Sequence, residues 1–453
     1  MSTSPVTPEF VVGQYDTGKL NLDGTLGHLT LEQSALLKKL WRKLLRSFEK
    51  STKDITQVAQ PEDTAQTVFK RSVRPRADDP DRSSTPQPEP VVASSSSSSS
   101  GIGGWFGFGV SKSSSDLQKK PAKEELLVGQ VAPKSSLPPP FAKTGGSHAQ
   151  RTIRDAFWGA VLCDHPDVLL LRFLRARKWD VDAALEMLLA CLRWRLDEEI
   201  DWVVWVGESE LNYKLVQRGI GVIHKTDRLG QPVLYIPVRL NDPQAQPADH
   251  MLDFTVYMME VSRLFLYTPV DKVCLVFDTT DMALSNMDWT FFKTFLHYLE
   301  HYYPECLGLV LIYNASWVFY SLWKIVRPLL DPVVASKVQF ATTAEELHRF
   351  IAPQNLPKAF NGGLDSFEFK YDLPEGDENK AMYDTEKREA AMQARDAACE
   401  AFERATGKWD DEGRAEAAQA LIAASRDADK HVRARTMYHR AGVIDNTCKV
   451  EWS

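Results

Sequence analysis

Cysteine is scarce in this chain, and its spacing matches no recognised motif. Six cysteines occur among 453 residues, at positions 163, 191, 274, 306, 399 and 448. No two of them show the CxxC spacing that is typical of structural zinc sites and redox dithiols. The pattern therefore predicts neither kind of site, and it fits a reducing compartment.

Long hydrophobic runs are also missing. The longest near-continuous apolar stretch covers residues 307–313, LGLVLIY, whereas a membrane-spanning helix needs roughly 20 apolar residues. The first ten residues, MSTSPVTPEF, show no basic region followed by an apolar run, so we predict no signal peptide. We therefore expect a cytoplasmic protein that contacts membranes only peripherally and transiently.

Positive charge does not predominate. The chain carries 54 Lys and Arg against 61 Asp and Glu, a net charge of −7. Nucleic-acid-binding proteins usually show the opposite balance, so we expect no nucleic-acid partner, and any anion must be bound by a local basic patch. Hydrophobic residues make up 43% of the chain, which argues against a wholly disordered or fibrous protein.

Catalytic motifs are absent from the sequence. It has no GxSxG elbow, no HExxH, no P-loop and no Cys-x5-Arg loop. His297 and His301 stand four residues apart on one expected helix, but no third ligand at a recognised spacing completes a metal site. We therefore predict a protein that is not an enzyme and that needs neither a metal nor a cofactor.

Two segments have a composition that cannot support a core. Residues 1–28 are polar and rich in turn residues, and residues 51–147 include seven consecutive serines and a triple proline. Such segments bury too little apolar surface to offset chain entropy, so we expect both to be disordered. Within the second, GIGGWFGFG at 101–109 is either an ordinary disordered segment or a small aromatic contact for a membrane or partner.

Between these segments, residues 29–50 predict an amphipathic helix. Thr30 and Gln33 have the spacing of a capping box, and the apolar residues that follow recur at helical intervals. The other face is basic, with Lys38, Lys39 and Arg42 among its residues. Such a helix can lie on an anionic membrane, but we favour packing of its apolar stripe on the rest of the protein.

The remainder of the chain predicts an α/β fold, with a small helical N-terminal module at 150–212. Its two main helices begin near Pro166 and after Asp180, which is a capping residue. Residues 213–370 contain a hairpin signal and two nearly continuous apolar segments, 273–279 and 309–313. Such segments are typical of a mainly parallel sheet flanked by helices. Residues 371–453 predict a charged tail of two long, mostly exposed helices.

One expected helix, at residues 317–330, is apolar on nearly every face. Its sequence is WVFYSLWKIVRPLL. A helix of this kind is either buried in a core or in contact with lipid. The residues alone leave open a plain core helix and a lid that faces a hydrophobic ligand on one side and a bilayer on the other.

Several segments together resemble the CRAL-TRIO family of lipid-binding proteins. They are, in family order, HPDVLLLRFLRARKWDVDAALEMLLACLRWR, VFDTTDM, LEHYYPECLG, LVLIYNASW, WKIVRPLLDPVVASKV and NLPKAFNGG, and they span about residues 150–370. LTLEQSALLKKLW and the charged C-terminal tail are similar to the fungal Csr-type branch, whose relatives include the yeast secretory phosphatidylinositol transfer proteins. The resemblance implies the CRAL-TRIO lipid-binding fold.

The resemblance also implies a single lipid held under a gating helix. That helix corresponds to 317–330, with Trp317, Phe319, Leu322, Trp323, Val326 and Leu330 as its gate residues. A phosphoinositide headgroup would be held by Arg177, Lys178, Glu305 and Lys337. Val334 stands where the family has a hydroxyl residue, and residues 278–285 replace a serine-rich loop that the family uses for phosphatidylcholine.

These observations lead to one main interpretation and one alternative. The main interpretation is non-enzymatic binding and intermembrane transfer of a phospholipid, most simply phosphatidylinositol, by a monomer. The bound phospholipid is then a ligand and not a cofactor. The alternative is a sensor or scaffold that binds a sterol or another isoprenoid and reports lipid status to a partner.

Overall fold

The computed structural model describes residues 19–49, 151–211, 213–246 and 248–452. Most of the two segments expected to be disordered, namely 1–18 and 51–147, lies outside these residues. Residues 19–28, which composition predicted to be disordered, instead contact the helical module: Arg175 Nη1 donates to the Gly24 carbonyl at 2.9 Å, and Thr25 is buried. Among the described helices, none combines the length and the apolar character needed to cross a bilayer.

The first helix, α1 (Leu31–Phe48), packs on the helical module with its apolar stripe. Its capping box is confirmed, because Thr30 and Gln33 exchange the two expected hydrogen bonds. Leu37, Leu40, Trp41 and Leu44 are buried against neighbouring helices, which confirms the interpretation favoured from the sequence. The neighbouring helices of the module are α2 (Ile153–Val161), α3 (Pro166–Ala176), α4 (Val181–Asp197) and α5 (Ile200–Val206).

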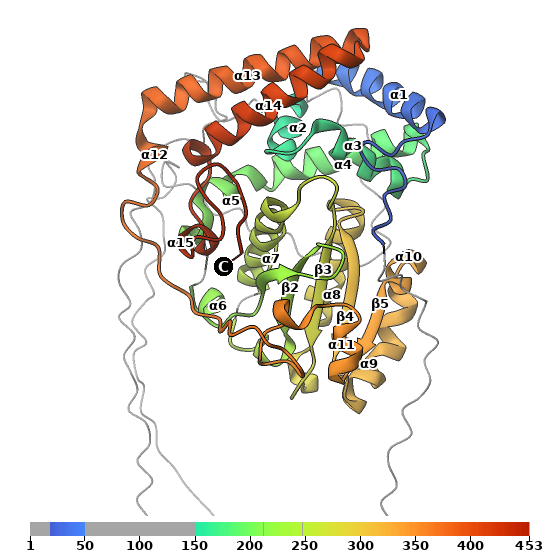
Figure 1. Ribbon diagram of the computed structural model, residues 1–453, viewed down its shortest axis with the longest axis vertical. Helices are drawn as coiled ribbons and strands as arrows, with labels where there is room; N and C mark the ends of the chain where they lie inside the picture. The colour runs from blue at the N-terminus through green and yellow to red at the C-terminus, as the bar shows by residue number, and fades with distance from the viewer. Residues whose placement is uncertain (1–18, 50–150, 212, 247, 453) are drawn as a thin grey trace, which may run out of the picture. The chain divides into compact units, whose positions relative to one another are not determined.

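A five-stranded sheet lies at the centre of the second part (Figure 1). Its strands are β1 (Val222–Thr226), β2 (Pro232–Pro237), β3 (Val273–Asp278), β4 (Leu307–Tyr313) and β5 (Val338–Ala341), and they follow one another in that order. The β1–β2 pair is antiparallel and the other three pairs are parallel. The predicted hairpin and the predicted mainly parallel α/β sheet are both confirmed.

Helices cover both faces of this sheet. One face meets α7 (Ala248–Ser262), α8 (Trp289–His301), α9 (Trp317–Val326) and α10 (Pro332–Ser336), and the other meets α11 (Ala344–His348). Alternate residues of β3 divide between the faces: Cys274 and Val276 pack with Leu347 and Ile351, whereas Leu275 belongs to the opposite cluster. A short helix, α6 (Tyr213–Gln217), precedes β1.

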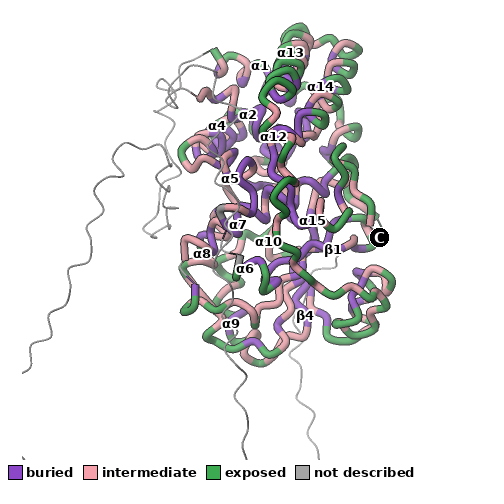
Figure 2. The backbone as a smooth tube through the Cα atoms, turned by 90° about the vertical axis from the view of Figure 1, so that its left-hand side faces the viewer, coloured by how far each residue is buried: buried purple, intermediate pink, exposed green. Residues whose placement is uncertain are grey.

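The C-terminal part forms a helical hairpin and then a buried end segment. The elements are α12 (Lys380–Tyr383), α13 (Thr385–Lys408), α14 (Asp411–Val432) and α15 (Met437–Arg440). Figure 2 shows many exposed positions along α13 and α14, as the tail prediction required. Their inner sides nevertheless contribute Cys399, Phe402 and Leu421 to the core around α1 and α2.

One buried carboxylate connects this hairpin to the helical module. Asp167 Oδ1 accepts hydrogen bonds from Trp41 Nε1 at 2.6 Å and from Arg414 Nη2 at 2.7 Å. Three segments that are far apart in the sequence therefore meet at one atom. Beyond α14, Met437, Tyr438 and Ile444 join the core around α7, a degree of burial that the charged composition of the tail did not predict.

Candidate functional site

A cavity of about 290 Å³ lies between the sheet and the helices that cover its α7–α9 face. The strands supply alternate side chains to it: Val273, Leu275 and Phe277 of β3 line the cavity, whereas Cys274 and Val276 do not. This division follows from the two-residue repeat of a strand. The main apolar lining residues from the helices are Met251, Phe254, Met258, Met259, Phe291, Phe292, Phe295, Leu296, Leu299, Phe319, Leu322, Trp323 and Val326.

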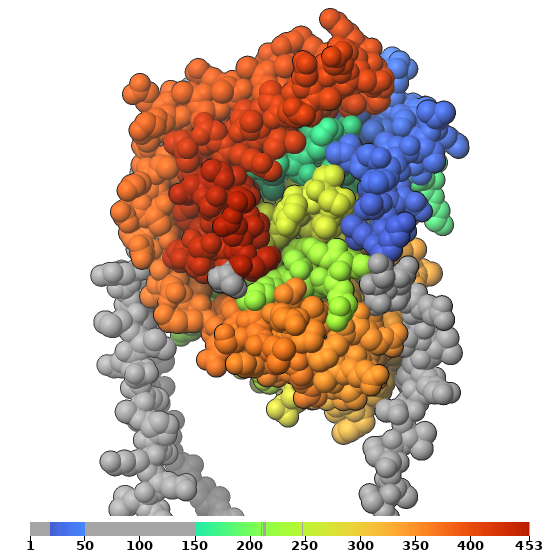
Figure 3. Space-filling model, viewed as in Figure 1, coloured from blue at the N-terminus to red at the C-terminus, as the bar shows by residue number. Residues whose placement is uncertain are grey.

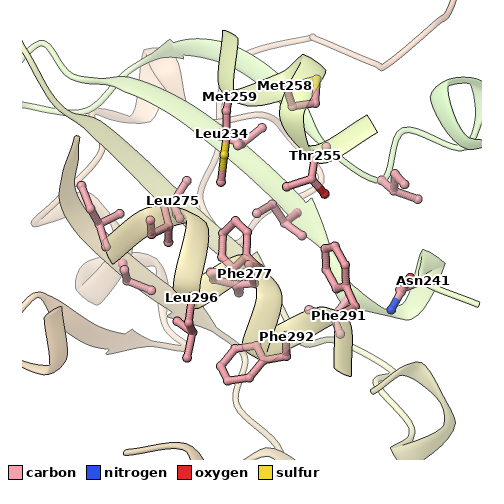
Figure 4. A pocket seen from close by; sticks show the side chains of 18 of the residues that line it. Leu234, Asn241, Thr255, Met258, Met259, Leu275, Phe277, Phe291, Phe292 and Leu296 are labelled. Atoms are coloured by element: carbon pink, nitrogen blue, oxygen red, sulfur yellow. The ribbon is translucent and has the colours of Figure 1, made fainter. Parts of the chain in front are cut away.

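Figure 4 shows how two walls of the cavity meet. Phe277 of β3 lies between Leu275 on one side and Phe291 of α8 on the other, and Met258 and Met259 come from α7. Methionine side chains are flexible and polarisable, so they adapt to irregular apolar shapes. The walls therefore suit hydrocarbon of variable shape better than a rigid polar molecule.

The polar side chains along α7 are already used within the protein. Thr255 Oγ1 donates to the Met251 carbonyl at 2.7 Å, and Ser262 Oγ donates to the Met258 carbonyl at 2.6 Å. Tyr303 donates to buried Glu260 at 2.8 Å. Because these donors are satisfied internally, the α7 wall offers little attraction to a polar ligand.

The helix at residues 317–330 covers one side of this cavity, as α9 followed by a 3-10 turn (Arg327–Leu329). Five of its six predicted gate residues line the cavity. They are Phe319, Leu322, Trp323, Val326 and Leu330. The sixth, Trp317, does not line the cavity and is 77% exposed. The helix is thus neither wholly buried nor a simple surface helix.

The exposed surface of residues 317–333 combines apolar side chains with basic ones. Ile325, Leu329 and Val333 are large exposed hydrophobic residues like Trp317. Exposed Lys324 and Arg327 lie on the same segment. A surface of this composition suits contact with an anionic membrane, where apolar side chains enter the interface and cations meet phosphates.

Two of the four predicted headgroup residues lie beside the cavity wall. Lys337 Nζ donates to the carbonyl of Leu307 at 2.8 Å, and Leu307 lines the cavity. Burial lowers the pKa of Lys337, the nearby Glu305 carboxylate opposes that shift, and Lys272 and Arg175 lower it further. A cation in this position gains from an anionic partner, because its own solvation is incomplete.

Arg177 and Lys178 lie at the end of α3. The Arg177 backbone N–H donates to the Phe173 carbonyl at 3.1 Å, and the exposed Lys178 has a left-handed backbone with φ of 49°. Among the cations near Lys337, Lys272 and Arg175 lower its pKa. The structure thus brings Glu305 and Lys337 together and adds Lys272, which no motif in the sequence pointed out.

Two other basic residues of α3, Arg172 and Arg175, have partners within the protein. Arg172 is buried and donates to Cys306 Sγ at 3.2 Å and to the Asp271 carbonyl at 3.0 Å. Arg175 pairs with the Asp271 carboxylate at 2.5 Å. These contacts hold α3 against the segment that precedes β3. They place the end of α3 near Cys306, which lines the cavity.

Comparison with known proteins identifies the architecture around this cavity. A model of the CRAL/TRIO domain matches residues 216–362, and a model of the CRAL/TRIO N-terminal domain matches residues 116–190. The CRAL-TRIO domain-containing protein C3H8.02 of Schizosaccharomyces pombe is 37% identical over 311 residues, covering 64% of this chain and 69% of that protein. The chain belongs to the CRAL-TRIO family.

Two further relatives carry functional names. The phosphatidylinositol transfer protein CSR1 of Eremothecium gossypii is 33% identical over 308 residues, 64% of this chain and 70% of that protein. The SEC14 cytosolic factor of the same organism is 29% identical over 257 residues, 50% of this chain and 83% of that protein. The resemblance drawn from the sequence, including its Csr-type branch, is confirmed for this CRAL-TRIO protein.

The two histidines of α8, His297 and His301, contact each other. The rings of His297 and His301 stack with centroids 4.2 Å apart, and His301 Nδ1 lies 3.1 Å from the His297 carbonyl. Among the described residues, the one group whose ligand atoms converge as a metal would require is elsewhere, at Cys163, Asp429 and Cys448.

Proposed function

We propose that this CRAL-TRIO protein binds one phospholipid in the cavity beneath α9 and transfers it between membranes without catalysing a reaction. The observation that carries the proposal is the two-sided character of α9. Phe319 and Trp323 line the apolar cavity, while Trp317 and Ile325 are exposed on the outside. A lid over a lipid needs an inner face for acyl chains and an outer face for the bilayer.

The outer apolar face follows from the energetics of exchange. Each methylene that enters water costs roughly 0.8 kcal/mol, so a lipid with two long chains does not leave the cavity through water. The cavity must open while α9 is in contact with a membrane. Lys324 and Arg327 on the same segment favour an anionic surface for this contact.

We further propose that the preferred phospholipid is phosphatidylinositol. Similarity to a protein named as a phosphatidylinositol transfer protein supports this, as does the partly buried Lys337 next to Glu305. In this arrangement Lys337, with Arg177 and Lys178 from the end of α3, meets the phosphate, and Glu305 accepts from inositol hydroxyls. The protein acts as a monomer in the cytoplasm and meets membranes transiently.

Transfer of labelled lipid between vesicles tests this proposal. Donor vesicles carry fluorescent phosphatidylinositol or fluorescent phosphatidylcholine, and acceptor vesicles carry a quencher. The variant Lys178→Ala with Lys337→Ala should lose phosphatidylinositol transfer, since a charge-assisted hydrogen bond contributes about 1.5–3 kcal/mol. Lys358→Ala, at an exposed lysine on another segment, is the matched control and should transfer normally.

The possible results separate the parts of the proposal. Normal phosphatidylinositol transfer by the double variant would contradict the headgroup assignment. Failure of the unmodified protein to transfer either lipid would contradict the transfer function itself. A double variant that loses both lipids equally would place the two lysines in membrane contact and not in headgroup binding.

A second candidate function has one observation in its favour. Because Thr255 and Ser262 donate to their own helix, the α7 wall suits a ligand with almost no polar groups, such as a sterol or another isoprenoid. A protein that held such a ligand would act as a sensor or scaffold and report lipid status to a partner. Saturable binding of a neutral isoprenoid, without phosphatidylinositol transfer, would support it.

A further inference from the structure

Two cysteines that are far apart in the sequence face each other at the surface of the helical module. Cys163 follows α2, and Cys448 lies four residues from the last described residue. Their Sγ atoms are 3.8 Å apart, and both thiols are free. Both residues are intermediate in burial, so small reagents can approach them. The spacing rule applied to the sequence missed this pair because 285 residues separate its members.

The surroundings of the pair favour sulfur–sulfur chemistry over metal binding. Asp429 approaches both sulfurs closely enough to be a third metal ligand. However, its two carboxylate oxygens already accept from Arg433 Nε at 2.7 Å and from Arg435 Nη2 at 3.0 Å. Two buried guanidinium groups repel a metal cation but stabilise a thiolate, which is the reactive form of cysteine.

The two sulfurs interact with each other and with a nearby guanidinium group. A hydrogen bond with Cys163 and burial raise the pKa of Cys448 well above its usual range. Negative charge on either sulfur would raise the pKa of Arg433. The Arg433 guanidinium therefore lies close to both sulfurs.

The backbone at both positions can move without breaking an element. Cys163 lies in the connection between α2 and α3, where the Asp164 N–H donates to the Val161 carbonyl. Cys448 lies in a turn, with φ of 59°, and its N–H donates to the Asp445 carbonyl at 3.2 Å. A disulfide needs its sulfurs about 2.05 Å apart, so two loop segments must approach each other by less than 2 Å in total.

We propose that Cys163 and Cys448 form a reversible disulfide that fastens the C-terminal segment to the helical module under oxidising conditions. The thiolate of one of the two cysteines attacks a small disulfide such as glutathione disulfide and releases one small thiolate, leaving a mixed disulfide. The other cysteine then loses its proton to water, and its sulfur attacks the mixed disulfide and releases the second small thiolate. Overall the protein loses two electrons and two protons, and the small disulfide is reduced to two thiols.

The bond would restrain a segment that supports the cavity wall. Tyr438 accepts a hydrogen bond from the Ile223 N–H of β1 at 2.8 Å, and Trp452 stacks on Phe265 at 5.3 Å. Phe265 follows α7, which lines the cavity. In Figure 3 this C-terminal segment, coloured dark red, lies at the surface. Oxidation would thus limit opening of residues 437–452 without touching the lipid.

The test uses the full chain, first reduced and then equilibrated with mixtures of glutathione and glutathione disulfide. Peptide mapping without reductant should show one crosslink, between Cys163 and Cys448, and the number of thiols open to alkylation after denaturation should fall from six to four. The melting temperature should rise by about 5 °C or more, because the bond closes a very long loop. Hydrogen exchange in residues 437–452 should slow.

Three variants complete the test. Cys163→Ser and Cys448→Ser should each abolish the crosslink, the rise in melting temperature and the slowing of hydrogen exchange. Cys191→Ala, at a buried cysteine on α4, should keep all three. A protein that forms only interchain crosslinks, or none between these two residues, would overturn the proposal. So would one zinc ion per chain that protects the same two thiols from alkylation, since the pair would then be a metal site.

Discussion

Replacement of Trp317 should weaken membrane docking while leaving the folded protein intact. A tryptophan can bury about 200 Å², and 77% of this side chain is exposed, so full insertion into hydrocarbon would remove roughly 150 Å² from water. At about 25 cal/mol per Å² this corresponds to nearly 4 kcal/mol. Insertion to headgroup depth buries about half of that area, so Trp317→Ala should lower vesicle binding by about 2 kcal/mol, or roughly 30-fold.

Sedimentation with anionic vesicles measures this binding, and thermal unfolding of the same sample measures stability. Because Trp317 has few buried contacts to lose, the free energy of unfolding should change by no more than about 0.5 kcal/mol. Leu31→Ala on α1 is the control, since Leu31 is even more exposed but lies far from α9 (Figure 1). Equal vesicle binding by Trp317→Ala and the unmodified protein would refute the docking role of α9.

Three further predictions concern the cavity, the core and pH. Trp323→Asp should lose lipid loading and several kcal/mol of stability, because Trp323 is 7% exposed and a buried charge without a partner is costly; a stable, lipid-loaded variant would argue against its inward position. Asp167→Ala should lower the free energy of unfolding by about 3 kcal/mol in urea titrations, since it leaves Arg414 buried without its carboxylate; an unchanged midpoint would count against this connection. Burial and nearby Arg435 lower the pKa of His439 to about 3 in the folded protein. As the pH drops below about 6.5, His439 becomes protonated in the unfolded chain but not in the folded protein, so the free energy of unfolding should fall. His439→Gln should reduce the dependence of the free energy of unfolding on pH between pH 7 and 5. Equal pH dependence in the variant and the unmodified protein would contradict this role of His439.

Much of the fold could be predicted because local patterns and tertiary packing agree. The nearly continuous apolar segments of β3 and β4 are largely buried on both faces of the sheet, which is the situation that such segments indicate. The Thr30 and Asp180 caps appear as expected, since capping depends on neighbouring residues alone. The start of α7 was less predictable, because the apolar pattern that indicates a helix covers residues 253–266 whereas the helix begins at Ala248.

The site could be predicted only in part, because its decisive features are long-range. The helix at 317–330 is apolar on almost every side, so its sequence does not reveal that Phe319 and Trp323 face inward and Trp317 outward. Lys272 acts on Lys337 although no motif connects the two. The Cys163–Cys448 pair likewise depends on contact between the module and the end of the chain, which spacing rules do not address.

The central claim is that the cavity beneath α9 holds one phospholipid, and native mass spectrometry of the purified full chain tests it most directly. The protein should carry a single additional mass, and lipid extraction should identify that mass as phosphatidylinositol. Lys178→Ala with Lys337→Ala should shift the bound population away from phosphatidylinositol. A protein that carries a neutral isoprenoid, or that stays without lipid after incubation with phosphatidylinositol vesicles, would contradict the account.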